Sequence, residues 1–330
     1  MPDDPERIVL GFYFEDFVAV GGIDAIDRVV GISRHPWQGW RPTQFERYAA
    51  LKPALNDLPD IGYSETSNFS AETVIALRPD VLLMAAMDYT ATPEAMAQIE
   101  GAGIPVVTLD YNAQTIERHL ASTRALGAVL GSEERAEELA LNYETAMNDI
   151  YARIAASDAL KGRKVYVELG TRGPGTVGNS YGSSMWGSLL TSMGAENIAA
   201  SQIGSYGQLS PEYVIAEQPD LIFIAGSNGT TPDAVSMGVA YDAEVARGNI
   251  AAYAQRPGWE NLPAIQNGNL FGINHGGART LSDYTYAQFI AKQLYPATFA
   301  DIDPEANLME FYAKYLPIDA SGAYMISALD

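Results

Sequence analysis

The sequence predicts an α/β protein of two lobes, each with a mostly parallel sheet flanked by helices, joined by a single long helix. Three observations predict this fold. Apolar strand segments alternate with helical segments in both halves of the chain, one amphipathic helix interrupts the alternation near the middle, and a pattern of 14 residues occurs twice. With 330 residues, the chain is also too long for one ordinary core.

The first half alternates strands with helices. Strands are expected at 8–12, 29–32, 81–84 and 106–109, and helices before 21–22, at 71–77 and at 93–100. Pro79 ends the helix at 71–77, and residues 33–41 are expected to form a loop. Such alternation implies a parallel sheet with both faces covered.

The alternation resumes in the second half. Strands are expected at 165–169, 221–224 and 270–273, and helices at 183–193, 211–217 and 280–294. The stretch 170–182 is rich in glycine but lacks the Lys-Ser/Thr ending of a phosphate-binding loop, and no nucleophile-elbow pattern is present.

Residues 132–157 predict the connecting helix. Ser132 is a suitable N-cap, and Glu133 and Glu134 follow in the first turn, where the helix dipole favours acidic residues. Apolar residues then recur at three- and four-residue steps: Ala136, Leu139, Tyr143, Met147, Ile150 and Ile154. The expected lobes are therefore 1–131 and 158–330; the alternative is an ordinary surface helix.

The repeated pattern covers residues 70–83 and 210–223. Ser, Glu, Val, Ile, Ala, Pro and Asp recur in register in the two segments. Glu72 and Glu212 occupy equivalent positions. The repeat predicts that the two lobes have related architectures.

Composition excludes several classes of function. Asp and Glu total 41 against 20 Lys and Arg, giving a net charge of −21. This charge disfavours nucleic acid and anionic lipid as partners and favours a soluble monomer. The absence of cysteine excludes disulfides, cysteine-ligated zinc, Fe–S clusters and thiol nucleophiles.

The first residues show neither the basic nor the apolar region of a signal segment. Taken alone, this favours a cytoplasmic protein; the alternative is a mature chain whose signal has been removed. No apolar run reaches the ~18 residues that a membrane-spanning helix needs.

Several separated segments carry a resemblance to a known family. They are the two repeats, the opening strands at 5–9 and 29–33, and the stretches 187–199 and 258–271. In order and pattern they resemble the class III periplasmic solute-binding proteins of ABC importers, which include receptors for ferric siderophores, haem and vitamin B12. The resemblance implies a rigid connecting helix, a ligand held in the cleft between the lobes, and a periplasmic or membrane-anchored location.

The resemblance also implies permease docking by one Glu in each lobe, here Glu72 and Glu212, although a Glu in the first turn also complements the helix dipole. Relatives place a metal-reaching side chain, often His, in the loop that here contains Tyr206. This residue could coordinate iron, or it could only line the cleft.

The remaining ligand candidates are loop residues of three kinds. Arginines suit an anionic chelate, flat aromatic rings suit a large delocalised ligand, and loop histidines could reach a metal. These candidates are Arg34, Arg172, Arg279, Trp37, Trp40, Tyr181, Trp186, His35 and His275. For each residue, the alternative is ordinary packing or a surface ion pair.

The sequence and the resemblance together predict a binding protein with no intrinsic cofactor. The expected ligand is a ferric siderophore, an Fe(III) chelate, with haem, cobalamin or an oxyanion such as molybdate as alternatives. The expected partner is a permease with a cytoplasmic ATPase. The alternative from another class is a nitrogenase-like or chelatase-type metal-cofactor enzyme, although the motifs such enzymes use are missing.

Overall fold

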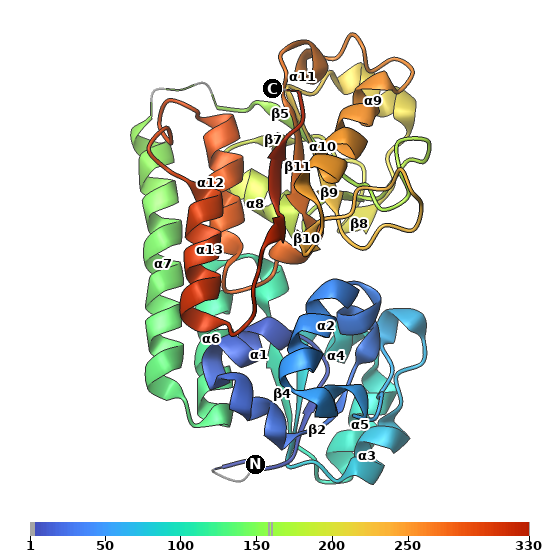
Figure 1. The fold of residues 1–330 in the computed structure, drawn as a ribbon, viewed down its shortest axis with the longest axis vertical. Coiled ribbons are helices and arrows are strands. Elements are labelled where there is room, and N and C mark those ends of the chain that lie inside the picture. The colour runs from blue at the N-terminus through green and yellow to red at the C-terminus, as the bar shows by residue number, and fades with distance from the viewer. Residues whose placement is uncertain (1–3, 158, 160, 330) are drawn as a thin grey trace. The chain divides into compact units, whose positions relative to one another are not determined.

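The computed structural model describes residues 4–157, 159 and 161–329, and the chain divides into two compact units (Figure 1). The first unit holds the chain up to Tyr111, together with Thr115–Thr145 and Glu310–Asp319. The second unit holds Asn112–Gln114, Ala146–Met309 and the chain from Ala320. Each unit contains its own sheet.

The sheet of the first unit is parallel throughout its described pairs. Its strands are β1 (Ile8–Leu10), β2 (Val29–Ile32), β3 (Val81–Ala85) and β4 (Val106–Leu109), in the order β2-β1-β3-β4. The helices are α1 (Phe14–Gly21), α2 (Pro42–Leu51), α3 (Ala71–Leu77), α4 (Ala86–Ala91), α5 (Pro93–Gly101) and α6 (Ile116–Leu130). Val9, Leu82 and Met84 of the sheet pack with Val74 and Ile99 of the helices in one apolar core.

The sheet of the second unit contains β5 (Lys164–Leu169), β7 (Glu196–Asn197), β9 (Leu221–Gly226), β11 (Leu270–Asn274) and β13 (Met325–Ser327), in the order β13-β11-β9-β5-β7. Here β13 pairs antiparallel with β11, whereas the other described pairs are parallel. Two short ribbons add β6 (Ser180–Tyr181) with β8 (Tyr206–Gly207), and β10 (Gly238–Val239) with β12 (Gly322–Ala323). The helices are α8 (Trp186–Ser192), α9 (Pro211–Glu217), α10 (Ala243–Ala251), α11 (Pro263–Gln266) and α12 (Asp283–Leu294). The predicted α/β fold with two mostly parallel sheets is confirmed.

The predicted connecting helix is also confirmed. Helix α7 (Glu133–Ala156) starts in the first unit and ends in the second. All six residues of its predicted apolar face are buried, each at most 7% exposed. The three- and four-residue spacing thus identified a helix whose stability comes from packing rather than from propensity alone.

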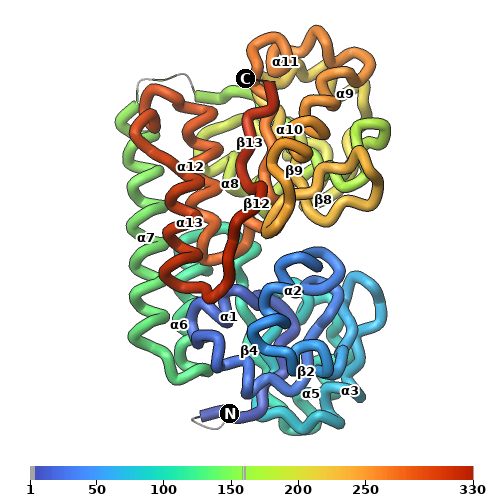
Figure 2. Tube along the Cα trace, in the orientation of Figure 1, coloured from blue at the N-terminus to red at the C-terminus, as the bar shows by residue number. Residues whose placement is uncertain are grey.

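Helix α13 (Pro304–Tyr315) returns the chain to the first unit, although the boundaries expected from the sequence assign residues 310–319 to the second lobe. Its last turn lies beside the first half of α7 (Figure 2). The Tyr315 hydroxyl donates to Glu138 at 2.8 Å, and Arg135 donates to the Tyr315 carbonyl at 3.0 Å. The Tyr312 hydroxyl donates to the Glu15 carboxylate at 2.9 Å.

The two repeated segments adopt the same local structure. Ser70 and Ser210 each cap a helix by accepting the N–H of the third residue along, at 3.1 Å in both cases. Both helices end in a left-handed residue, Arg78 at φ 48° and Gln218 at φ 52°. The Pro-Asp pair then leads into a strand that lies between two parallel neighbours, β3 between β1 and β4 and β9 between β5 and β11.

The aspartate of each repeat fixes the helix to the sheet. Asp80 accepts the backbone N–H of Arg7 at 2.9 Å, and Asp220 accepts that of Lys164 at 2.8 Å. Both donors lie at the start of the unit's first strand. The recurrence of Pro-Asp in the sequence therefore has a physical reason, because the carboxylate satisfies backbone groups that the sheet leaves unpaired.

Two local predictions are corrected by the structure. The expected loop at 33–41 contains a turn of π-helix, His35–Gly39, in which the Trp40 N–H donates to the His35 carbonyl five residues earlier. The helix expected at 183–193 begins only at Trp186, because Met185 has a non-helical backbone at φ 47° and ψ −122°. Neither feature has a signal in hydrophobic periodicity.

Gly62 and Gly22 provide a matched test of how tightly the first unit is packed. Both have positive φ, 75° and 76°. A Cβ on Gly62 would lie 2.1 Å from the Asn68 carbonyl oxygen, whereas one on Gly22 would meet nothing within 4 Å. We expect Gly22→Ala to cost about 1–3 kcal/mol in backbone strain, because φ 76° with ψ 171° is a region open essentially to glycine alone, and Gly62→Ala to cost roughly 1–3 kcal/mol more because the loop must shift. Urea unfolding of the two variants measures the difference, and equal losses would contradict the prediction.

Candidate functional site

Four of the predicted ligand residues come together in the second unit. They are Tyr181, Tyr206, His275 and Arg279, which we call the tyrosine cluster. Tyr181 and Tyr206 are cross-strand partners in the β6–β8 ribbon, with ring centroids 5.3 Å apart. The Tyr181 hydroxyl lies 2.9 Å from Nδ1 of His275. Tyr181 is buried, whereas Tyr206 is 46% exposed, so the cluster presents one phenol ring to solvent.

Arg279 places a positive charge in the tyrosine cluster. Its side chain is buried, and Nη1 lies 3.5 Å from Sδ of Met185. Arg279 and Met185 both have positive φ, 61° and 47°, which is unusual for residues other than glycine. Strained backbone of this kind is concentrated at functional sites, where surrounding contacts hold it in place.

Burial raises the pKa of Tyr181 well above its ordinary value, and the neighbouring Tyr206 adds to the effect, while the charge of Arg279 opposes it. Tyr181 therefore keeps its proton at neutral pH and can donate it to Nδ1 of His275. In a neutral imidazole, this leaves the N–H on Nε2. Tyr181 thus orients the histidine ring, whereas the Tyr206 ring is partly exposed to solvent.

Two other predicted residues of the second unit have different surroundings. Arg172 is exposed, and its Nη2 lies 3.2 Å from the Val177 carbonyl oxygen in its own loop. Trp186 is fully buried and packs against Tyr286, with ring centroids 5.9 Å apart. The buried position of Trp186 fits ordinary packing, the alternative to a ligand role.

The first unit contains a second group of aromatic residues, which we call the aromatic cluster: Phe12, His35, Trp40 and Tyr63. The His35 ring lies 5.5 Å from the Trp40 ring and 5.9 Å from the Tyr63 ring, and Phe12 lies 6.2 Å and 6.0 Å from the same two. His35 is exposed and lines a polar pocket of about 380 Å³ with Gln38, Asp60, Thr66 and Asn68 among its walls.

Arg34 and Trp37 have structural contacts in the first unit. The Nη2 of Arg34 donates to the carbonyls of Leu55, Asn56 and Leu58 at 2.7–3.2 Å, which holds that loop in place. Trp37 is buried against Phe14, with ring centroids 3.5 Å apart. In these contacts the guanidinium and the indole support the loop around His35.

Sequence reasoning missed Phe12 and Tyr63 of the aromatic cluster. It also missed the adjoining Tyr13 and Tyr111: the Tyr13 ring lies 4.8 Å from the Phe12 ring and 4.9 Å from the Tyr111 ring. Phe12 and Tyr13 follow directly after β1, and Tyr111 follows β4. Carboxyl ends of parallel strands meet at one edge of a sheet, and ligand sites in open α/β sheets concentrate there. Aromatic residues at the end of a predicted strand, or within two positions after it, were therefore an available signal for Phe12, Tyr13 and Tyr111. Tyr63, which depends on the turn at Gly62, had none.

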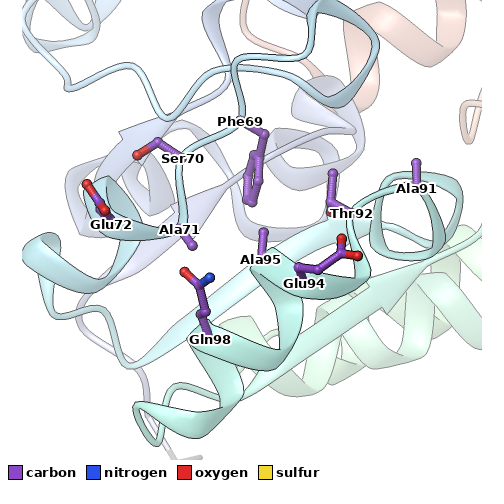
Figure 3. Close-up of a pocket in the computed structure, with 9 residues that line it drawn as sticks. All are labelled: Phe69, Ser70, Ala71, Glu72, Ala91, Thr92, Glu94, Ala95 and Gln98. Atoms are coloured by element: carbon purple, nitrogen blue, oxygen red, sulfur yellow. The ribbon is translucent and has the colours of Figure 1, made fainter.

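Glu72 and Glu212 are both exposed, each at the second position of its capped helix. Glu72 lines a groove of about 460 Å³ together with Glu94, Gln98 and Phe69. In Figure 3, Glu72 on α3 and Glu94 on α5 lie on opposite sides of the Phe69 ring. The groove thus combines an apolar floor with two carboxylates, which complements a cationic side chain.

Two further findings limit the chemistry of the described residues. Within 4–157, 159 and 161–329, no three or more His, Cys, Asp and Glu side chains gather as a metal site. In the same residues, no helix is long and apolar enough to cross a membrane.

Comparisons with known proteins agree with this architecture. A family profile described as "Periplasmic binding protein" matches residues 10–275. The solved structure of the TroA-like periplasmic binding protein FepB from Veillonella parvula is similar, with a TM-score of 0.91 and 32% identity over 99% of this chain and 96% of that one. The uncharacterised ABC transporter substrate-binding lipoprotein YvrC of Bacillus subtilis is 24% identical over 71% of this chain and 68% of its own length. The molybdate-binding protein MolA of Haemophilus influenzae is 24% identical over 96% and 87%.

The variant Tyr181→Phe tests the raised pKa of Tyr181. It removes the hydrogen bond to His275, which we expect to cost about 1 kcal/mol at neutral pH. In the wild type, the folded state disfavours the phenolate, whereas an unfolded chain ionises near the ordinary pKa of 10.0. The stability from Tyr181 is therefore complete below about pH 10 and is lost as the pH rises further. The variant has no such loss, so the difference in free energy of unfolding between wild type and variant should narrow as the pH rises above about 10.

Urea unfolding of wild type and Tyr181→Phe at neutral pH and above about pH 10 measures this difference in free energy. A constant difference at alkaline pH would show that Tyr181 ionises as easily in the folded protein as in the unfolded chain, and a widening one that it ionises more easily; either result contradicts the raised pKa.

Proposed function

Because the chain belongs to the periplasmic binding protein family, as the substrate-binding protein of an ABC importer, we propose that it captures a ferric siderophore or a similar Fe(III) chelate and delivers it to the permease. Proteins of this family bind an extracytoplasmic solute and catalyse no reaction. The alternative of a nitrogenase-like or chelatase-type enzyme is therefore excluded.

The observation that carries the proposal is the tyrosine cluster. Tyr206 offers an exposed phenol, and a phenolate oxygen is a ligand that ferric iron accepts in proteins. Arg279 stands in the same cluster, and its forked guanidinium suits the anionic oxygens of catecholate or carboxylate chelators. His275 adds a polar ring whose orientation is fixed by Tyr181.

The aromatic cluster of the first unit supports a ligand that carries flat aromatic groups. Trp40 and His35 present ring surfaces next to a polar pocket, a combination that suits a chelate with aromatic arms and polar substituents. Haem and cobalamin contain a flat macrocycle, so they are the alternatives on this ground. Molybdate would gain nothing from aromatic rings, but the guanidinium of Arg279 suits an oxyanion. The similarity to MolA also supports molybdate as an alternative.

We further propose that Glu72 and Glu212 dock onto the permease. The two residues occupy the same position in segments of matching local structure, one in each unit, and both are exposed. Two equivalent carboxylates on one chain match the two-fold arrangement of an importer's membrane subunits. The groove beside Glu72 gives a cationic side chain of the permease room to enter next to Phe69.

Calorimetric titration with ferric chelates tests the ligand. We expect one site with a Kd below about 1 μM, or about −8 kcal/mol. A tetradentate chelator leaves two iron positions open, whereas a hexadentate one leaves none. Tyr206→Phe should therefore weaken tetradentate chelates about tenfold or more, leave hexadentate ones nearly unchanged, and remove a visible phenolate-to-iron band.

The matched control is Tyr151→Phe, which removes a phenol hydroxyl bonded to Ser192 in the same unit. Absence of binding to every ferric chelate, or chemical turnover of one, would refute the proposed function. Equal affinities and spectra for Tyr206→Phe and wild type would leave Tyr206 only as part of the wall.

Charge reversal tests the docking residues. Glu72→Arg or Glu212→Arg should abolish delivery of the ligand to the permease in proteoliposomes, while ligand affinity stays within about twofold. Glu117→Arg is the matched control, because Glu117 also occupies the second position of a capped helix, α6, in the first unit. This control loses the same helix-dipole interaction. If Glu117→Arg impairs transport equally, or if either docking variant transports normally, the assignment is wrong.

A further inference from the structure

We propose that the buried ion pair of Arg256 and Glu168 positions the ligand site. It fixes the conformation of the glycine-rich loop 170–179 and, through that loop, the position of the ribbon that carries Tyr181 and Tyr206. This inference rests on the proposed ligand role of the tyrosine cluster. It assigns a function to two residues that lie outside that cluster.

The ion pair is bidentate and removed from water. Nη1 and Nη2 of Arg256 lie 2.6 Å and 2.7 Å from the two carboxylate oxygens of Glu168. The Glu168 side chain is fully buried, and that of Arg256 is 10% exposed. Desolvating both charges is costly, so such a pair persists only when its remaining hydrogen-bonding groups are also satisfied.

Aromatic residues enclose the pair on several sides. The Arg256 guanidinium lies over the rings of Tyr253 and Trp259, 4.5 Å and 4.8 Å from their centroids. The hydroxyl of Tyr166 donates to Glu168 at 2.9 Å. Burial together with the Glu168 charge raises the pKa of Tyr166 well above its ordinary value, so this hydroxyl remains a donor.

The other groups of the pair bind the backbone of the glycine-rich loop. Arg256 donates from Nε to the Pro174 carbonyl and from Nη2 to the Thr176 carbonyl, both at 2.7 Å. The Gly178 N–H donates to Glu168 at 2.7 Å. A Cβ on Gly178 would lie 1.9 Å from the Leu169 carbonyl oxygen, so this close approach of the loop requires glycine. These three contacts with the loop backbone make the ion pair a support for the conformation of residues 174–178.

The positioned loop leads directly to the tyrosine cluster. The loop joins β5 to β6, so its last residue, Asn179, is followed by Ser180 and Tyr181. The Val177 carbonyl accepts from Nε2 of Gln208 at 2.9 Å, two residues beyond Tyr206. Both strands of the ribbon are therefore tied to the segment that Arg256 holds.

Stability alone does not account for this arrangement. Replacing a buried ion pair by apolar residues of similar volume is often neutral or stabilising, whereas removing one partner is strongly destabilising. An apolar pair cannot bind two carbonyls and an N–H of the loop. What Arg256 and Glu168 contribute beyond packing is thus the geometry of the loop.

The test separates stability from positioning. The variants are Glu168→Leu, Arg256→Met, the double variant with both changes, and Arg256→Lys, which keeps the charge but loses the fork. Each apolar single variant should lower Tm, and the double variant should recover most of that loss. The double variant and Arg256→Lys should nevertheless bind the ferric chelate that wild type prefers at least tenfold more weakly. Glu217→Gln, which breaks the half-exposed Lys164 pair of the same unit, is the control and should bind normally.

Hydrogen exchange supplies a readout that needs no ligand. In Arg256→Lys and the double variant, amides of 170–181 and 204–208 should exchange at least tenfold faster, while those of β9 and β11 remain as in wild type. Unchanged exchange in these loops overturns the positioning role even if no chelate binds. Wild-type affinity in a folded double variant does the same. Failure of the wild type to bind any ferric chelate, with faster loop exchange in the variants, would refute the proposed ligand and keep the positioning role of the pair.

Discussion

The parallel pairing of strands is the constraint on which both units depend. Because parallel strands all point the same way, their carboxyl ends meet at one edge, and the residues that follow them are brought together whatever their distance in sequence. Phe12, His35 and Tyr111 follow three different strands of the first sheet. His275 and Arg279 follow β11 in the second unit, and the loop after β5 leads to Tyr181. The placement of the candidate ligand residues thus depends first on strand direction and only then on individual contacts.

The repeated segments with Ser, Glu, Pro and Asp form the same local contacts beside both sheets. The serine satisfies an N–H at the start of the helix, a left-handed residue ends the helix, and the aspartate binds the backbone at the start of the neighbouring first strand. The serine cap and the left-handed helix end each involve residues close together in the chain, so the pattern can be recognised in the sequence. In both copies, the exposed glutamate takes part in none of these contacts and interacts with the fold only through the helix dipole.

Hydrophobic period and capping predicted the fold well, because both signals act over a few residues. The bounds of β2, β4, α3 and α9 matched those expected, and α7 differed by one residue at each end. The site was only partly predictable, since it depends on which partner each side chain finds. An arginine such as Arg34 looks the same in the sequence whether it meets a ligand or three carbonyls, and Tyr63 is indistinguishable from a core tyrosine. The ion pair of Arg256 and Glu168 is likewise invisible, because its partners lie 88 positions apart.

The return of α13 to the first unit has a consequence for biosynthesis. Tyr312 binds Glu15 across a separation of 297 positions, and Tyr315 binds Arg135 and Glu138. Residues 1–145 leave the ribosome long before their last contacts exist, because residues 146–309 must be made first. At typical elongation rates of about 5–20 residues per second, that delay is roughly ten to thirty seconds. During this interval, the carboxylate of Glu15 and the flank of α7 remain open to water or to a chaperone, so the first unit stays incomplete until most of the second has been synthesised.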